Sequence, residues 1–267
     1  MLSAQADVAV PIHSLFLCED RRYPVATDRW VLGCSEKGQV DSLWHFESRR
    51  LDVLPLSNHW LQGDALFRAG VDGGFWSVET QRFSGSRIFE LPEDSAGRVN
   101  EKYVVLAATD SIVLLERTEG KTYTVAANPM GYQVPALLQE QVAWIEWSGD
   151  KKEILLWNWE TQKKTAHPAG NPLYLESEGN ILIWSEPETI QILDVETDER
   201  REIKTQSRGP LSIQNGRVCW AEWKKEDTDI RCSDGFVLER EGNQFSPIQL
   251  DKGLLFQEEQ GIMWLSY

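Results

Sequence analysis

The residues that most often carry catalysis are scattered along this chain instead of forming a motif. The four histidines are His13, His45, His59 and His167. None of them belongs to a His-Glu-x-x-His sequence, the metal-binding pattern of zinc proteases. The Ser-Gly-Ser segment at 84–86 has no neighbouring histidine, and no G-x-S-x-G nucleophile elbow occurs in the chain. We therefore expect no catalytic residues and no enzymatic activity.

Acidic residues recur at one position of a repeating pattern, two residues after a short apolar run. These residues are Glu146, Glu186, Glu222 and Glu258. Equivalent positions of a repeat face the same end of a molecule, so four carboxylates there would suit calcium or a basic segment of a partner. The alternative is that each glutamate bonds local backbone or solvent at a strand end. We expect no cofactor, keep calcium open as a ligand, and assign no metal-binding residues.

Two tryptophans stand at the ends of the strands that are richest in apolar residues. They are Trp147 in the sequence Trp-Ile-Glu-Trp and Trp223 in the sequence Trp-Ala-Glu-Trp, each just before a charged loop. An exposed tryptophan beside charge is typical of a protein-binding hot spot or of a platform for sugar stacking. The alternative is a partly buried side chain that shields a sheet edge. With the four glutamates, these tryptophans are the candidate binding residues.

The four cysteines fall into two pairs that are close in sequence. Cys219 and Cys232 lie on adjacent strands of one expected hairpin, and Cys18 and Cys34 are also near each other. None belongs to a Cys-x-x-Cys motif, which makes a zinc site improbable. Two disulfides in an oxidising compartment and four buried free thiols are both compatible with this arrangement.

Seven short apolar runs form the framework that must position these residues. Their last members are Leu32, Phe67, Leu106, Trp144, Trp184, Trp220 and Phe256, at intervals of 35, 39, 38, 40, 36 and 36 residues. A second pattern follows several runs, in which alternating apolar and polar residues lead into Glu-Ser or Glu-Thr, as at 157–161 and 193–197. A period of two is the period of a β-strand, and the polar cluster after it predicts a turn.

Each repeat has room for four short strands and shows no helical periodicity. Four-stranded units with a period near 40 residues are typical of β-propellers. We therefore predict a single all-β domain, 1–267, that forms a seven-bladed β-propeller of four-stranded blades. The predicted blades are 22–57, 58–92, 95–128, 132–168, 171–206, 209–242 and 245–267. The last blade has three strands, and we expect an N-terminal strand at 12–18 to complete it and close the ring.

The repeats also resemble a known group. The segment 210–220 resembles the P-x-small-x-x-G-x-V-x-W unit of TolB-like and cell-surface-type bacterial propeller repeats, and the turn at 193–197 is similar to their Asp-x-x-Thr turn. The Ser-Pro-Asp-Gly turn of many TolB-type blades is replaced here by turns such as Gln-Asn-Gly at 214–216. The resemblance implies a bacterial β-propeller, and proteins of this class serve mostly as protein-interaction modules.

Composition narrows the classes of partner. The net charge of −15 and the isoelectric point near 4.8 argue against nucleic acid, which requires a basic surface. No run of 18 apolar residues predicts a transmembrane helix. The segment Ala-Gln-Ala at 4–6 has the form of a leader cleavage site, and with the pairable cysteines it leads us to expect export to the periplasm or secretion. The absence of a complete signal peptide favours the cytoplasmic alternative.

Together these features predict a non-catalytic, monomeric propeller that acts as a protein-interaction or scaffolding module. Two alternatives remain open. A carbohydrate-binding propeller would repeat exposed tryptophan at equivalent positions, and an enzyme such as a lyase or hydrolase with an axial metal would direct histidines or carboxylates toward the axis.

Overall fold

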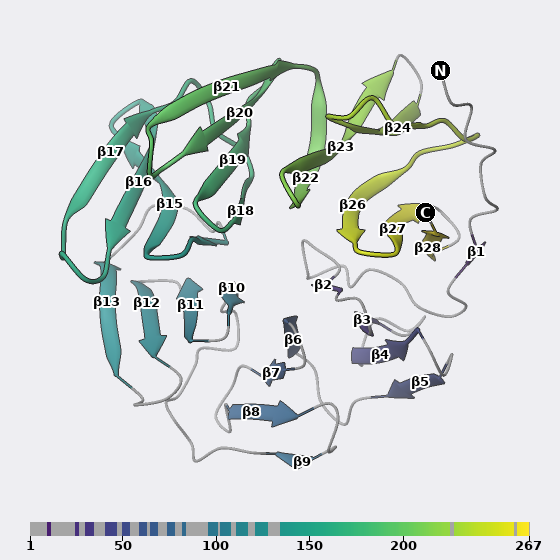
Figure 1. Ribbon diagram of the computed structural model, residues 1–267, viewed down its shortest axis with the longest axis horizontal. Helices are drawn as coiled ribbons and strands as arrows, with labels where there is room; N and C mark the ends of the chain where they lie inside the picture. Colours follow the sequence, from purple (N-terminus) through teal and green to yellow (C-terminus); the bar gives the residue numbers. More distant parts are fainter. Residues whose placement is uncertain are drawn as a thin grey trace. The chain divides into compact units, whose positions relative to one another are not determined.

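The fold was analysed in a computed structural model. It describes residues 10–11, 25–26, 30–34, 41–46, 50–53, 59–62, 65–68, 74–77, 82–83, 96–100, 102–107, 111–116, 121–127, 134–224, 227–258 and 261–266. Within these ranges every regular element is a β-strand, and the strands form antiparallel sheets of four (Figure 1). No helix with the length and hydropathy needed to cross a membrane occurs in the described part of the chain.

The described strands belong to two compact units. The first unit combines Met1–Ser57 with Thr205–Tyr267, and the second is Asn58–Lys204. The strands of the first unit are β1 (Val10–Pro11), β2 (Val25–Ala26), β3 (Trp30–Cys34), β4 (Asp41–His45), β5 (Arg50–Val53), β22 (Ser207–Gln214), β23 (Arg217–Lys224), β24 (Asp227–Cys232), β25 (Val237–Leu238), β26 (Phe245–Leu250), β27 (Gly253–Glu258) and β28 (Gly261–Ser266).

The second unit contains four sheets, each built from consecutive strands. Its strands are β6 (His59–Gln62), β7 (Ala65–Arg68), β8 (Gly74–Ser77), β9 (Arg82–Phe83), β10 (Ala96–Val99), β11 (Tyr103–Ala107), β12 (Ser111–Glu116), β13 (Thr122–Ala127), β14 (Ala136–Leu137), β15 (Gln141–Ser148), β16 (Lys151–Asn158), β17 (Lys164–Pro168), β18 (Leu175–Glu178), β19 (Ile181–Ser185), β20 (Thr189–Asp194) and β21 (Glu199–Lys204).

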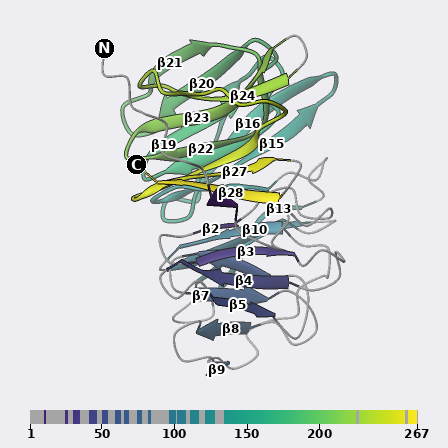
Figure 2. The same cartoon turned by 90° about the vertical axis from the view of Figure 1, so that its right-hand side faces the viewer.

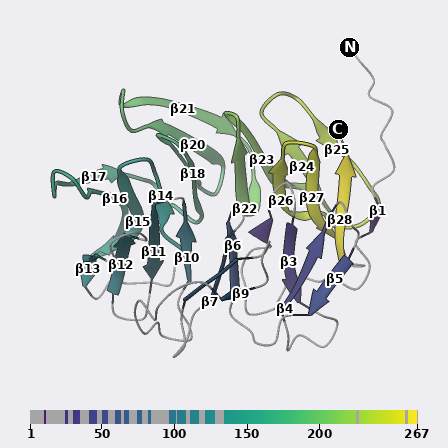
Figure 3. The same cartoon turned by 60° about the horizontal axis from the view of Figure 1, so that its bottom comes forward.

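Within each unit the first strands of successive sheets contact each other. In the second unit β6 contacts β10, β10 contacts β14, and β14 contacts β18. In the first unit β22 contacts β26, and β26 contacts β2. Figures 1 and 2 show the sheet β14–β17 beside the sheet β18–β21, and Figure 3 shows β3–β5 beside β26–β28. Successive sheets of a unit therefore pack face to face with their first strands side by side.

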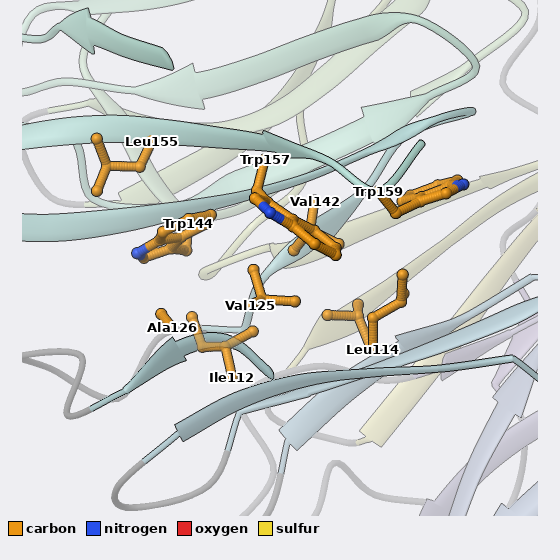
Figure 4. Packing of buried hydrophobic residues seen from close by; sticks show 10 residues of the cluster. Ile112, Leu114, Val125, Ala126, Val142, Trp144, Leu155, Trp157 and Trp159 are labelled. Atoms are coloured by element: carbon orange, nitrogen blue, oxygen red, sulfur yellow. The ribbon is translucent and has the colours of Figure 1, made fainter. Parts of the chain in front are cut away.

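Large apolar side chains fill the spaces between neighbouring sheets. Between the sheets β10–β13 and β14–β17, Trp144 and Trp157 pack above Ile112 and Leu114 (Figure 4). The next space in the second unit is filled around Trp184, which is 2% exposed. Each strand alternates its side chains between two faces, so a strand buried on both faces reads as a nearly continuous apolar run. This explains the five apolar runs whose burial the structure describes, those that end at Leu106, Trp144, Trp184, Trp220 and Phe256.

The recurring polar turn has one geometry in two sheets. After β16, the side chain of Asn158 accepts hydrogen bonds from the amides of Glu160 and Thr161, at 3.1 and 2.8 Å. After β20, Asp194 accepts from Glu196 and Thr197 in the same way, at 2.9 and 3.2 Å. These two amide donors, Thr197 first, lower the pKa of Asp194. An Asn or Asp side chain thus organises each turn, as these residue types commonly do.

The hairpin between β22 and β23 is a two-residue turn. Asn215 and Gly216 both have positive φ, 52° and 73°, which the favoured type I′ hairpin turn requires at both central residues. The Asn-Gly pair of the sequence therefore sets the register of these two strands.

The chain's N-terminal strand completes the sheet of its last three strands. The strand order is β1-β28-β27-β26, with Val10 opposite Trp264 and Pro11 opposite Met263. The sequence-based prediction placed this strand at 12–18, which lies outside the described residues, and the observed pairing is at Val10–Pro11. Val10 and Pro11 therefore pair with the last strand of the chain within the first unit.

Candidate interaction surface

The recurring glutamates have local partners, and the first of these is the tryptophan two residues earlier. In β15 the indole Nε1–H of Trp144 donates to Glu146 at 2.9 Å, and Lys164 lies 3.6 Å from the same carboxylate oxygen. In β19 Trp184 donates to Glu186 at 3.0 Å. Residues i and i+2 of a strand point to the same face, so a Trp-x-Glu sequence places the acceptor beside the buried donor.

The backbone shares the Glu186 acceptor. The amide of Gly170 donates to Oε1 of Glu186 at 2.9 Å, and this is the oxygen that also accepts from Trp184. One carboxylate oxygen thereby joins β19 to the segment that leads into its sheet. A buried indole N–H requires such a partner, because leaving it unbonded costs free energy.

The other two glutamates show variations of this arrangement. In β23 Trp220 donates to the hydroxyl of Thr205 at 2.8 Å, and that hydroxyl donates to Glu222 at 2.7 Å. Arg231 forms an ion pair with Glu222. In β27 the apolar run ends in phenylalanine, which has no N–H donor, and Glu258 instead pairs with Arg240 at 2.8 Å.

These contacts assign each glutamate to its own local network. Glu146 and Glu186 lie in the second unit, and Glu222 and Glu258 lie in the first. Among the described residues no group of three or more histidine, cysteine, aspartate or glutamate side chains is arranged to hold a metal ion. The role of the four carboxylates as a shared binding site stays a prediction.

Trp147 is exposed at the tip of the hairpin between β15 and β16. Its side chain is 43% exposed, the largest value among the exposed apolar residues of the described chain. Lys152, its partner in the strand register, places its ammonium 4.9 Å from the centre of the Trp147 ring. A cation at this distance over an aromatic face is stabilising. The Trp147 surface therefore combines an apolar ring with a positive charge.

Trp223 occupies the equivalent position in β23. Its side chain is 40% exposed, and its backbone N–H donates to the carbonyl of Gln206 at 3.1 Å. The indole of Trp223 is thus carried by a strand whose backbone is hydrogen-bonded at this residue. Two exposed tryptophans, each three residues after a buried one, show that the spacing Trp-x-Glu-Trp places one ring in the core and the next at the surface.

One pair of cysteines is joined in the structure. Cys219 of β23 and Cys232 of β24 are directly opposite in the register, are buried, and form a disulfide. Cys18 lies outside the described residues, so its pairing with Cys34 is not placed. The disulfide links the two central strands of a sheet, and Cys219 lies four residues before Trp223 in β23.

The three described histidines lie on three different sheets. His45 is in β4, His59 in β6 and His167 in β17. The Nδ1 atom of His167 is 2.8 Å from Nη2 of Arg200 in β21, and since the guanidinium is always a donor, the neutral ring accepts this bond. Burial and the Arg200 charge lower the pKa of His167, while Asp198 opposes them.

The structure also shows an ion pair that no sequence pattern indicated. Arg98 of β10 and Glu176 of β18 meet at 2.8 Å, although 78 residues separate them and they belong to different sheets of the second unit. Both are on the first strand of their sheet, and the two-residue strand β14 lies between these strands in chain order. Only the packing of sheets brings them together, so spacing along the sequence could not reveal the pair.

Comparison with solved structures identifies the fold. A chain from the crystal structure of a mitotic checkpoint complex matches with a TM-score of 0.68 and 10% identity, covering 98% of this chain and 94% of the other. The β-propeller domain of the Trilobed protease from Pyrococcus furiosus matches with a TM-score of 0.63 and 12% identity, covering 98% and 94%. PorZ of Porphyromonas gingivalis, a surface component of the type-IX secretion system, matches with a TM-score of 0.58 and 12% identity, covering 96% of this chain and 39% of its own length.

The comparisons of sequence find no match, whereas the comparison of structures does. No protein-family model matches the chain, and no curated protein matches it in sequence. The structural matches have low identity, so they establish the fold and leave the activity open. The chain is an all-β protein of antiparallel four-stranded sheets with the fold of the β-propeller proteins.

Proposed function

We propose that this chain is a non-catalytic protein-interaction module whose sheets close into one seven-bladed propeller. The observation that carries the proposal is the exposure of Trp147 and Trp223 at equivalent positions of two sheets. Large aromatic side chains at a surface are costly to leave in water and are enriched in protein-binding hot spots. Structural similarity to a chain of a multiprotein complex supports the same class of function.

The proposal also covers the class of partner, the cellular compartment and the absence of catalysis. A monomeric chain with a net charge of −15 would bind protein and not nucleic acid. The disulfide Cys219–Cys232 supports an exported protein, because disulfides persist in oxidising compartments. The four recurring glutamates, Glu146, Glu186, Glu222 and Glu258, are engaged by tryptophan, threonine, lysine, arginine and backbone partners, which supports a structural role for them over a catalytic one.

A parallel screen tests the proposed class of function. The purified chain, immobilised through one terminus, is panned against a random peptide library and probed with a glycan array under identical conditions. The proposal predicts convergent peptide sequences and no glycan signal above that of an unrelated propeller. Binding of a defined glycan, lost in Trp147→Ala or Trp223→Ala, would instead support the carbohydrate-binding alternative and contradict the proposal.

A further inference from the structure

A second exposed aromatic residue lies at the same rim as Trp223. Phe245 begins β26 and is 37% exposed. Thr228 is opposite Trp223 in the strand register, and its carbonyl accepts the amide of Gln244, the residue before Phe245, at 3.0 Å. Since β23 also contacts β26, the two aromatic residues come to one rim of the first unit. Trp223, Phe245 and the loop 239–244 are called the aromatic rim below.

Hydrogen bonds within its loop hold the aromatic rim in place. Gln244 is completely buried, and its side-chain amide donates to the carbonyls of Gly242 at 2.7 Å and Arg240 at 3.3 Å. The hydroxyl of Thr228, also completely buried, donates to the carbonyl of Gln244 at 2.9 Å. A surface that is ordered before binding loses less conformational entropy when a partner docks. The loop therefore presents Phe245 from a fixed backbone.

The charge of the aromatic rim is negative. The segment 224–245 contains six acidic and four basic residues. The ammonium of Lys224 lies 2.5 Å from Asp229 and 2.6 Å from Glu239, and Arg240 is paired with Glu258. These basic side chains are held by carboxylates, while Asp227 and Glu241 add further negative charge. The surface around Trp147 has no such excess of negative charge. Its segment 147–153 has two acidic and two basic residues, and one of the basic residues, Lys152, lies over the Trp147 ring.

From these observations we infer that the aromatic rim binds an extended segment of a partner protein in which Lys or Arg stands next to an apolar side chain. The apolar side chain packs on Trp223 and Phe245, and the basic one lies against Glu241. This inference rests on the proposed protein-interaction function and assigns to it a surface and a class of partner. Complementary charge at the rim of an interface steers association and selects the partner.

The test uses variants of the whole chain and peptides selected on the wild-type protein from the random library. The inference predicts that selected peptides place Lys or Arg beside an aromatic or aliphatic residue. Trp223→Ala and Phe245→Ala should each weaken peptide binding about tenfold or more, as for an interface hot spot. Glu241→Lys should weaken it severalfold, with a larger effect at low salt than at high salt.

Val237→Ala serves as the matched control. It truncates a residue that is 38% exposed in the same sheet and should change peptide affinity by less than about twofold. Trp147→Ala removes the exposed tryptophan of the second unit and compares the two candidate surfaces, and the inference predicts that it weakens binding less than Trp223→Ala does. Because Glu241 is exposed, Glu241→Lys reports on binding even if an aromatic variant fails to fold.

The outcomes separate this inference from the function on which it rests. If Trp147→Ala weakens binding and Trp223→Ala does not, the protein-interaction function stands and the assignment to the aromatic rim is wrong. Selected peptides that are acidic or uncharged would also overturn the assignment. A library that yields no convergent peptide on the wild-type chain contradicts the proposed function and the inference together.

Discussion

At the scale of single residues, glutamate serves as the acceptor for a buried indole. Oε1 of Glu186 accepts both the Trp184 N–H and the Gly170 N–H. Substitution Glu186→Ala leaves both donors without this partner and should lower the free energy of unfolding by about 1–3 kcal/mol. Glu186→Gln keeps an oxygen at the position of Oε1 and should cost less than half as much. Urea unfolding followed by tryptophan fluorescence measures both changes.

The neighbouring residue Glu188 supplies the control for this prediction. It is exposed in the same turn, so Glu188→Ala should leave the urea midpoint close to that of the wild type. A Glu186→Ala variant as stable as Glu188→Ala would show that the indole–carboxylate bond contributes no net stability.

His167 gives the fold a predictable dependence on pH. Its pKa in the folded chain is lowered from 6.5 by burial and by Arg200, so the unfolded chain takes up a proton first as the pH falls. Stability from this residue is therefore present above pH 6.5 and is lost as the pH falls through 6.5 toward the folded-state pKa. His167→Gln keeps an acceptor for Arg200 but does not titrate.

Thermal or urea unfolding at several pH values between about 7.5 and 5.5 (about one unit either side of the ordinary histidine pKa) measures this effect. The wild type should lose more stability over this window than His167→Gln does. Parallel pH profiles for the two proteins would contradict the assignment of a neutral His167 to the bond with Arg200.

At the scale of elements, the disulfide joins two central strands of one sheet. Cys219 and Cys232 are 13 residues apart in sequence, and a loop of this length corresponds to about 3 kcal/mol of stabilisation in the chain-entropy model. The free energy of unfolding of the double variant Cys219→Ala/Cys232→Ala, measured in urea, should be lower than that of the wild type by about this amount. Reductant should destabilise the wild type more than the double variant, and equal sensitivity to reductant would contradict this role.

The N-terminal strand protects an apolar edge. β1 pairs with β28, whose Met263 and Leu265 are buried. A chain lacking residues 1–11 leaves the edge of β28 unpaired, and unpaired apolar strand edges promote association. Size-exclusion chromatography should show oligomers or aggregates for this truncation and a monomer for a chain lacking only residues 1–8. A monomeric, equally stable 1–11 truncation would show that β1 is dispensable.

The sequence predicted strands well where periodicity and turn signals agree. The four strands expected between 134 and 167 are present as β14–β17, and the three expected after 245 are β26–β28. These segments combine apolar runs with polar turns organised by residues such as Asn158. The prediction that an N-terminal strand completes the last sheet is confirmed by the pairing of β1 with β28, and the expected range 12–18 lies outside the described residues. A two-residue strand such as Val10–Pro11 leaves almost no periodic signal in the sequence.

The candidate site was less predictable than the strands, for a physical reason. The position of Trp147 and Trp223 at strand ends was visible in the sequence, and both are exposed. The partners of the glutamates, such as Thr205 for Glu222, depend on packing between strands that spacing does not specify. Phe245 was missed because only the contact of β26 with β23 brings it to the rim of Trp223.

At the scale of the whole molecule, two features combine. Antiparallel four-stranded sheets stack through apolar faces within each unit, and the chain carries a net charge of −15. A strongly charged surface keeps a protein soluble while exposed aromatic residues provide specific contact area. The proposed function therefore depends on where a partner docks on this surface.

Hydrogen–deuterium exchange of the wild-type chain, with and without a peptide selected from the random library, shows directly where a partner docks. Docking on the aromatic rim predicts slower exchange on peptide binding at 223–224 and 227–245, the strands and loop that carry Trp223 and Phe245, with little change around Trp147. Slower exchange confined to other sheets, or no change at saturating peptide, would contradict it.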